Sequence, residues 1–339
     1  MVSLFFFIYF ILLVNVIFLQ KTKFENSFFV LSAVLLFLIA GFRSDDVTND
    51  YTGYVDYYND IINHSFSRVE PSFIYITEFV NFAFHDVLYL FVVYAFLGVF
   101  FKYVAIANLS EYKLHSAFIY FCSFFLILEM TQIRAGVATG LVLLCIKPIK
   151  ERKILQFLFF ALLAFFFHFS ALFILLFYFL NATKINKKVY FALIPLGYLM
   201  YFLNINLFFF LDFLQIDLIQ MKFESYGAAD NDINLFNWVY LSRILLGFFL
   251  LWKIDLIQER NDYAIILIKF YFISLFVFSA FATIPGISTR ISELLLIVEI
   301  ILTPCLLYVF RNKAVANFVI FIIGLIHLCF SIFITKLLL

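Results

Sequence analysis

The stretch from residue 28 to residue 58 reads FFVLSAVLLFLIAGFRSDDVTNDYTGYVDYY, and it passes abruptly from apolar to densely polar sequence. Arg43 stands at the end of the apolar run, and a cluster of carboxylates and tyrosines follows it. Such a run has the composition of a helix in a bilayer, and tyrosine suits the place where membrane meets water. The stretch therefore predicts a membrane helix that ends at a polar working surface.

The same contrast runs through the whole chain. Apolar residues make up 65% of the 339 residues and charged residues only 13%. A globule in water needs more polar surface than this, so a soluble fold is excluded. The apolar residues come in blocks of about 15 to 25, long enough to cross a hydrocarbon core of roughly 30 Å as helices. The predicted fold is an all-α polytopic membrane protein, with residues 1–339 in a single integral membrane domain.

Basic residues set the predicted orientation. Lys21 and Lys23 follow the first apolar run (4–19), which has no small-residue cleavage site after it and predicts a retained span. A second basic cluster contains Lys147, Lys150, Arg152 and Lys153. Cytoplasmic loops carry an excess of lysine and arginine, so both turns should face the cytoplasm and the amino terminus the outside. Counting the later apolar blocks in the same way, with basic clusters placed in the cytoplasm, gives about twelve spans, within a range of roughly 10 to 14.

Two large loops are predicted on the outer side, over residues 43–86 and 212–237. Acidic residues outnumber basic ones in both, as is typical of translocated loops. Within the first loop, the run from Pro71 to Phe84 is short and interrupted by polar residues. It predicts a re-entrant or interfacial helix with Pro71 in its first turn.

Two local patterns are informative about helices near the outer side. Tyr51, Tyr54 and Tyr58 are spaced to share one face of a helix. Residues 154–180 are too long for one ordinary span and have basic clusters before and after them. Two short helices that break at His168 would return the chain to the cytoplasm and bring His168 to the outer side.

Four basic groups are expected at the outer ends of spans: Arg43, Arg134, His168 and Arg290. An arginine at membrane depth costs about 2.5 to 3.5 kcal/mol on insertion scales, so several on one face indicate an anionic partner. Guanidinium matches phosphate oxygens at two points and stays charged in a low-dielectric pocket. Each arginine could instead reach lipid headgroups or pair with a nearby carboxylate. His168 could be a phosphate ligand, a proton donor or a buried histidine bonded to a backbone carbonyl.

Three carboxylates are candidates for a general base: Glu129, Asp50 and Glu70. Glu129 lies close in sequence to Gln132 and Arg134, and it could orient the arginine or act as the base. The chain has no metal-binding signature and no nucleotide-binding motif, so neither a metal nor a cofactor is expected, and no nucleic-acid partner. The cysteines all lie inside apolar runs and are interpreted as small core hydrophobes: Cys122, Cys145, Cys305 and Cys329.

Several short motifs follow one another along the chain in a characteristic order. They are G-F-R at 41–43, D-Y-x-x-Y at 50–54, E-P at 70–71, Q-x-R-A at 132–135, F-H-x-S-A at 167–171, and the arginine at 290. In this order and on this side of the membrane they resemble the EpsG group of Wzy-type polysaccharide polymerases. The resemblance spans most of the chain.

The resemblance implies an O-antigen (lipopolysaccharide) or exopolysaccharide polymerase, a glycosyltransferase with a GT-C-like fold. It would act at the outer face of the bacterial cytoplasmic (inner) membrane, by metal-independent inverting transfer between oligosaccharide units linked to undecaprenyl diphosphate. The diphosphates would be held by Arg43, Arg134, His168 and Arg290. The glycan would be bound by Tyr51, Tyr54, Tyr58 and Gln132. Membrane lipids and a chain-length regulator are the further partners that this implies.

Two other functions stay open. A flippase or other transporter predicts charges near mid-membrane and Gly- or Pro-broken helices in matched halves, whereas this chain has ten Gly and five Pro and its charges at outer ends. An O-antigen ligase shares the lipid chemistry and would need a lipid A-like acceptor.

Overall fold

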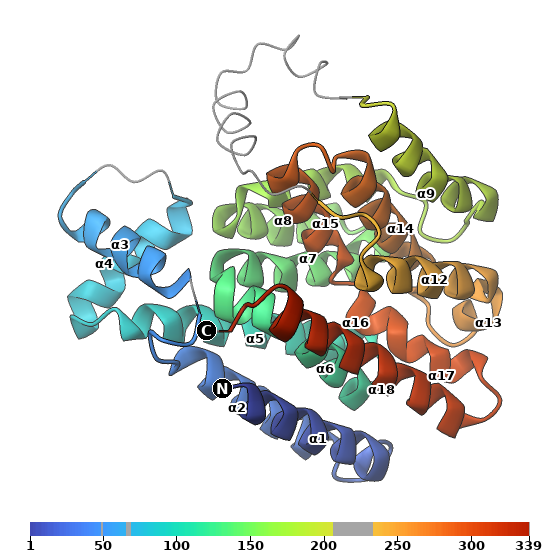
Figure 1. Cartoon of the computed structure of the whole chain (residues 1–339), viewed down its shortest axis with the longest axis horizontal. Coiled ribbons are helices and arrows are strands. Elements are labelled where there is room, and N and C mark those ends of the chain that lie inside the picture. Colours follow the sequence, from blue (N-terminus) through green and yellow to red (C-terminus); the bar gives the residue numbers. More distant parts are fainter. Residues whose placement is uncertain (49, 66–68, 206–232, 339) are drawn as a thin grey trace. The chain divides into compact units, whose positions relative to one another are not determined.

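The structure is a computed structural model that describes residues 1–48, 50–65, 69–205 and 233–338 (Figure 1). In these residues the regular structure is all helical, and no strand occurs among them. The all-α fold class expected from the sequence is therefore confirmed for the described part. The chain divides into two compact units: unit 1 contains Met1–Leu180 and Glu299–Leu339, and unit 2 contains Asn181–Val298.

Unit 1 begins with two apolar helices, a pair of shorter helices and a long apolar helix. Their bounds are α1 Val2–Leu19, α2 Glu25–Gly41, α3 Asp50–Ile62, α4 Pro71–Phe84 and α5 Leu88–Leu109. A short helix, α4, lies where one was predicted, and Pro71 takes its first position, where the missing N–H costs no hydrogen bond; the re-entrant or interfacial placement of α4 stays a prediction. The predicted tyrosine face is confirmed in α3, which buries Tyr54 and Tyr58 and exposes Asp56.

The next helices form the centre of unit 1. Their bounds are α6 Lys113–Tyr120, the π-helical segment η1 Phe121–Thr131, α7 Ile133–Glu151, α8 Ile154–Phe167 and the 3₁₀ segment η2 Phe169–Phe179. Almost every side chain of α6 and η1 is buried. In the adjoining layer α5 packs between α2 and α7, and α7 packs against α8. His168 has an extended backbone (φ −153°, ψ 120°) between α8 and η2, so the predicted break there is confirmed.

The carboxyl-terminal part completes unit 1, and α18 packs against η1. Its bounds are α16 Glu299–Leu302, η3 Thr303–Cys305, α17 Leu306–Val309, α18 Lys313–Cys329 and η4 Phe330–Ile334. Unit 2 contains α9 Lys187–Phe202, α12 Trp238–Trp252, α13 Ile254–Gln258, α14 Ala264–Ala280 and α15 Pro285–Leu296. Most of the second predicted outer loop, 212–237, lies outside the described residues.

Five helical stretches in the described residues are long and apolar enough to cross a membrane. They are Val2–Leu19, Leu88–Leu109, Lys113–Thr131, Pro285–Val309 and Lys313–Ile334. Several shorter apolar helices accompany them. On α1 the side chains of Phe7, Phe10 and Phe18 are 62%, 60% and 70% exposed, which suits contact with lipid tails. The number of spans stays a prediction.

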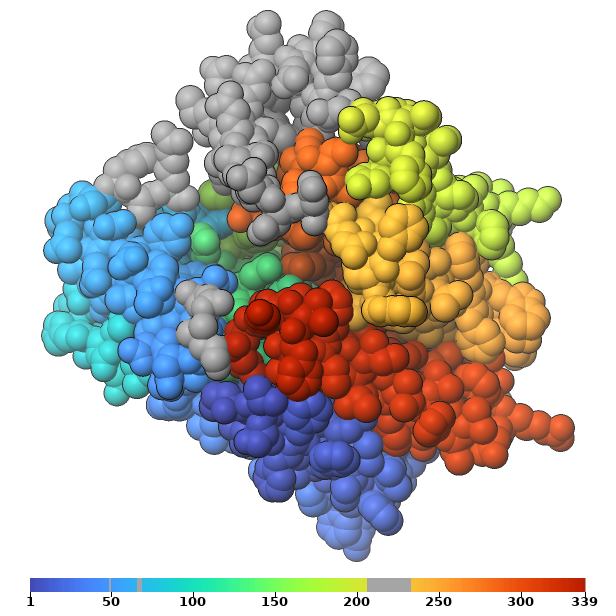
Figure 2. All heavy atoms as spheres, viewed as in Figure 1, coloured from blue at the N-terminus to red at the C-terminus, as the bar shows by residue number. Residues whose placement is uncertain are grey.

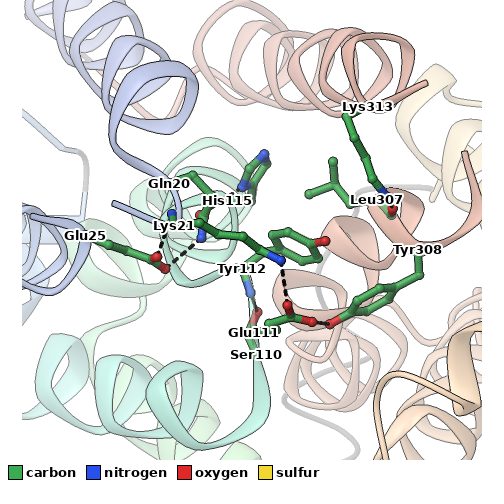
Figure 3. A network of polar contacts seen from close by, with 10 residues as sticks. All are labelled: Gln20, Lys21, Glu25, Ser110, Glu111, Tyr112, His115, Leu307, Tyr308 and Lys313. Atoms are coloured by element: carbon green, nitrogen blue, oxygen red, sulfur yellow. Dashed lines mark hydrogen bonds and ion pairs between the residues drawn. The ribbon is translucent and has the colours of Figure 1, made fainter. Parts of the chain in front are cut away.

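A polar network ties helix ends together at one end of unit 1 (Figure 3). Lys21 Nζ lies 2.7 Å from Glu111 Oε1, and the Tyr308 hydroxyl donates to Glu111 Oε2 over 2.9 Å. His115 Nδ1 lies 3.1 Å from Gln20 Oε1. Helix α2 begins and α5 ends at this network, so the opposite end of unit 1 is where α2 ends and α5 begins. Figure 2 shows α3 and α4, in light blue to cyan, at the surface of the unit.

Candidate active site

The candidate active site lies at the end of unit 1 opposite that network, where helix ends meet the pair α3 and α4 (Figure 1). Arg43 follows α2 and lies against Phe91, in the first turn of α5. Arg134 is the second residue of α7, and His168 directly follows α8. Three of the four predicted phosphate ligands therefore come from the same end of unit 1.

Glu70 links two of these groups. One of its carboxylate oxygens forms an ion pair with Arg134 Nη1, and the other lies 3.1 Å from His168 Nδ1. Burial alone would raise the pKa of Glu70, but the hydrogen bond from His168 and the charge of Arg134 lower it to about 2. Glu70 is thus a carboxylate that is ionised at neutral pH and that contacts both the arginine and the histidine.

The local sequence explains why Glu70 can do this. Pro71 starts α4, and the residue before a proline prefers an extended backbone, which Glu70 adopts (φ −65°, ψ 148°). Its side chain is therefore directed away from α4 and toward α7 and α8. His168 is likewise extended at the break after α8. Its Nδ1 faces Glu70, and its buried Nε2 has no hydrogen-bond partner among the described residues.

Arg43 is buried, with only 4% of its surface exposed. Its Nη1 donates to the Ala40 carbonyl (2.6 Å) and, over 3.5 Å, to the Glu129 carbonyl. Its Nε and Nη2 are buried and meet no acceptor in the described part of the chain. Burial lowers the pKa of Arg43 to about 10, so the group keeps its charge at neutral pH. Buried N–H groups of a guanidinium are expected to find an acceptor, and an anion supplies one.

An aromatic shelf, formed by Tyr51, Tyr54, Phe73 and Phe91, connects the two arginines. Tyr51 stacks on Phe91 with ring centroids 4.4 Å apart, and Tyr54 lies 6.2 Å from Phe91 and 5.9 Å from Phe73. The Arg43 guanidinium lies 4.4 Å from the centroid of Phe91. The Arg134 guanidinium lies 5.6 Å from Phe73 and 5.8 Å from Tyr54. Ring faces of this kind hold cations in place and can stack on sugars.

The three candidate bases have different surroundings. Both carboxylate oxygens of Glu70 already have partners, one in Arg134 and the other in His168. Glu129 is 1% exposed and its Oε1 lies 2.5 Å from the Nζ of Lys102. Asp50, the first residue of α3, is exposed; desolvation raises its pKa, and the charge of Arg43 offsets only part of that rise.

Of the other predicted site residues, Tyr58 and Gln132 belong to unit 1 and Arg290 to unit 2. The Tyr58 hydroxyl donates to Asn81 Oδ1 over 3.4 Å, within the α3–α4 pair. Gln132 occupies the junction of η1 and α7, half-buried, two residues before Arg134. Arg290 lies in α15, which begins at Pro285 and belongs to unit 2. Its role stays a prediction.

Lys102 was missed by reasoning from the sequence. It is the only ionisable side chain in α5 apart from tyrosines, and it is fully buried. An ionisable residue inside an apolar span is a functional hypothesis by default, and this signal was present in the sequence. Phe73 and Phe91 gave no comparable signal, because phenylalanine occurs 53 times in the chain.

Across residues 1–48, 50–65, 69–205 and 233–338, no three His, Cys, Asp or Glu side chains come together in a group that could hold a metal ion. The expectation of a metal-independent site stays a prediction.

Apolar membrane-length helices and a buried basic cluster at one end of unit 1 define the class as an integral membrane protein with a candidate anion-binding site. The model of the EpsG family matches residues 26–338, and the chain belongs to this family. Membership indicates a membrane protein of the polysaccharide-polymerase type. Comparison with curated proteins found no match, and comparison with solved structures found none either.

Proposed function

We propose that the protein is a polysaccharide polymerase that joins undecaprenyl-diphosphate-linked oligosaccharide repeat units at the outer face of the cytoplasmic membrane. The observation that carries the proposal is the buried Arg43, with Nε and Nη2 unpartnered among the described residues, beside the Arg134–Glu70–His168 chain. A diphosphate offers several strong acceptors and matches the guanidinium geometry. Membership of the EpsG family supports the same reaction class.

The proposed reaction is an inverting glycosyl transfer. The bond between the anomeric carbon of the growing glycan and its diphosphate breaks, and a hydroxyl oxygen of the acceptor unit bonds to that carbon from the opposite face. The diphosphate leaves with the bonding electron pair. Arg43 and Arg134 neutralise the charge that develops on it, which is the role a divalent cation would otherwise have. His168 Nε2 would bind or protonate a phosphate oxygen.

A carboxylate must take the proton from the acceptor hydroxyl, and Asp50 suits this step best. A base works well when its pKa lies near the working pH. The pKa of Glu70 is about 2, which makes it a weak base, and both of its oxygens are engaged. Glu129 is engaged with Lys102 away from solvent. Asp50 is exposed beside the aromatic shelf and has a raised pKa.

The remaining assignments belong to the same proposal. Tyr51, the half-buried tyrosine of the shelf, would stack on a sugar ring, and Gln132 would extend the glycan site, whereas Tyr54 and Tyr58 are buried in α3. About twelve spans in a GT-C-like arrangement would place this end of unit 1 on the outer side of the membrane. Arg290 would contribute to the second diphosphate site, and a chain-length regulator would bind in the membrane.

The test is incubation of the purified protein in detergent, with chelator present, with a lipid-linked repeat unit, followed by gel separation of the products. A ladder spaced by one repeat is expected for the wild type and for Arg311→Ala, which removes an exposed arginine. Arg134→Ala should give no ladder while it still inserts in the membrane. A normal ladder from Arg134→Ala would overturn the proposed site. Movement of the lipid-linked unit across liposomes without product would favour a flippase.

A further inference from the structure

The buried ion pair of Lys102 and Glu129 lies outside the chemistry described above. Lys102 Nζ is 2.5 Å from Glu129 Oε1, and neither residue is more than 1% exposed. Both are in membrane-length helices, α5 and the α6–η1 stretch. Removing two charges from water is costly, and apolar residues of similar volume often serve stability as well or better. The pair therefore calls for a reason beyond stability.

The pair connects three helices. Besides Glu129 of η1, Lys102 Nζ donates to the carbonyl of Gly136 in α7 over 2.5 Å. A lysine of α5 thus holds the last turn of η1 and the first turn of α7 at fixed positions. The Gly136 carbonyl also accepts from Thr139 Oγ1 over 2.8 Å.

Three glycines make the space for this arrangement. A Cβ added at Gly98 would overlap the carboxylate of Glu129, and one at Gly136 would come within 2.9 Å of Glu129 Oε2. A Cβ at Gly140 would lie 2.8 Å from the Cβ of Phe101 and 3.2 Å from the backbone nitrogen of Lys102. Small residues four apart, as at 136 and 140, let helices in a membrane approach closely. The site is therefore shaped around the ion pair.

The last turn of η1 is also where the segment after α2 is held. The Glu129 carbonyl accepts from Arg43 Nη1 (3.5 Å), and the Met130 carbonyl accepts from Thr48 Oγ1 (3.1 Å). The last carbonyls of a helix have no partner within it, so they can accept from other segments. The side chain of Glu129 faces Lys102 while its main chain faces Arg43.

We propose that Lys102 and Glu129 are positioning residues that act through the main chain of η1 to hold Arg43, whose Nε and Nη2 meet no acceptor in the described part of the chain, in place for the diphosphate. Glu129 then orients an arginine without being the base. The inference rests on the proposed function for the identity of the anion. The positioning itself concerns Arg43, so a readout of anion binding can test it without glycosyl transfer.

The discriminating variants are Glu129→Gln and Glu129→Ala. Glutamine keeps the volume and an oxygen that can accept from Lys102, but it cannot act as a base. Positioning predicts that Glu129→Gln stays within about tenfold of the wild type in kcat, whereas loss of a general base costs about 10² to 10⁴-fold. Glu129→Ala should raise KM for the lipid-linked unit by about tenfold or more, because the phosphate ligand is displaced.

A double-mutant cycle with Arg43 separates positioning from a general loss of structure. If Glu129 acts through Arg43, then Glu129→Ala in an Arg43→Ala background should raise KM no further. Ser123→Ala is the matched control, because Ser123 is a polar residue of η1 whose hydroxyl lies 2.8 Å from His327 Nδ1, and its hydrogen bonds within the described part of the chain do not include Arg43. It should leave KM unchanged in both backgrounds. Additive effects of Glu129→Ala and Arg43→Ala would overturn the inference.

A second readout uses inorganic diphosphate as the probe and thermal unfolding in detergent as the signal. Diphosphate should raise the midpoint temperature of unfolding of the wild type and of Ser123→Ala. This rise should be lost in Arg43→Ala and in Glu129→Ala. A wild-type shift retained in Glu129→Ala would overturn positioning. A wild type that shows the shift but forms no ladder would contradict the polymerase proposal and leave the positioning tested.

Discussion

Replacement of Glu70 by glutamine tests the Arg134–Glu70–His168 chain, because glutamine resembles the protonated carboxyl. Folding lowers the pKa of Glu70 from its ordinary 4.5 to about 2. Each pKa unit corresponds to about 1.4 kcal/mol, so the ionised carboxylate should stabilise the fold by about 3 kcal/mol at neutral pH. The loss of one partner in a buried pair commonly costs a similar amount.

The sign of the pH dependence follows from the direction of the shift. Since the folded state has the lower pKa, the stabilisation is complete above pH 4.5 and is lost as the pH falls toward 2. The free energy of unfolding of the wild type should therefore exceed that of Glu70→Gln by about 3 kcal/mol at pH 7, and this difference should become smaller below pH 4.5. Unfolding in detergent by SDS titration between pH 7 and pH 3 measures this difference.

A matched control is Glu78→Gln, which changes an exposed carboxylate on the same helix, α4. It should leave the free energy of unfolding within about 0.5 kcal/mol of the wild type. If Glu70→Gln were as stable as the wild type at pH 7, the ionised Glu70 carboxylate would not stabilise the fold as proposed. A difference between the two that stays constant down to pH 3 would also contradict this stabilisation.

Three further predictions concern catalysis and packing. Asp50→Asn should lower kcat by about 10² to 10⁴-fold with little change in KM, measured as ladder formation, and near-normal kcat would remove Asp50 as the base. Arg134→Lys keeps the charge but loses the planar fork, so kcat/KM should fall by about 10² or more, and unchanged kinetics would contradict a two-point phosphate contact. Gly98→Ala should destabilise the fold by about 1 to 3 kcal/mol in the same unfolding assay, because the added methyl overlaps the Glu129 carboxylate. The control is Gly53→Ala, whose added methyl meets nothing within 4 Å and should be neutral or slightly stabilising.

The helices were largely predictable because membrane helices are long apolar blocks with polar ends. The retained span expected over 4–19 lies within α1, and Pro71 and the tyrosine spacing located α4 and α3. The break at His168 followed from the excess length of residues 154–180 between two basic clusters. These features are local, so the sequence alone determines them.

The partners of the charged residues were not predictable in the same way. Glu70 meets Arg134 across 64 positions of sequence, and Lys102 meets Glu129 across 27. Such pairs depend on which helices pack together and on where a glycine leaves room, as Gly98 does for the Glu129 carboxylate. The order of the motifs correctly indicated which helix ends form the candidate site. It did not indicate which carboxylate forms an ion pair with a cationic side chain.

The most direct test of the central claim is an experimental structure of the protein with a lipid-linked diphosphate bound. Phosphate oxygens are expected at roughly 2.7 to 3.2 Å from Nε and Nη2 of Arg43 and from Nε2 of His168, which are buried nitrogens that meet no partner among the described residues. The sugar next to the diphosphate should lie over Tyr51, the half-buried ring of the aromatic shelf. A diphosphate bound elsewhere in the molecule, with these nitrogens still away from it, would contradict the account.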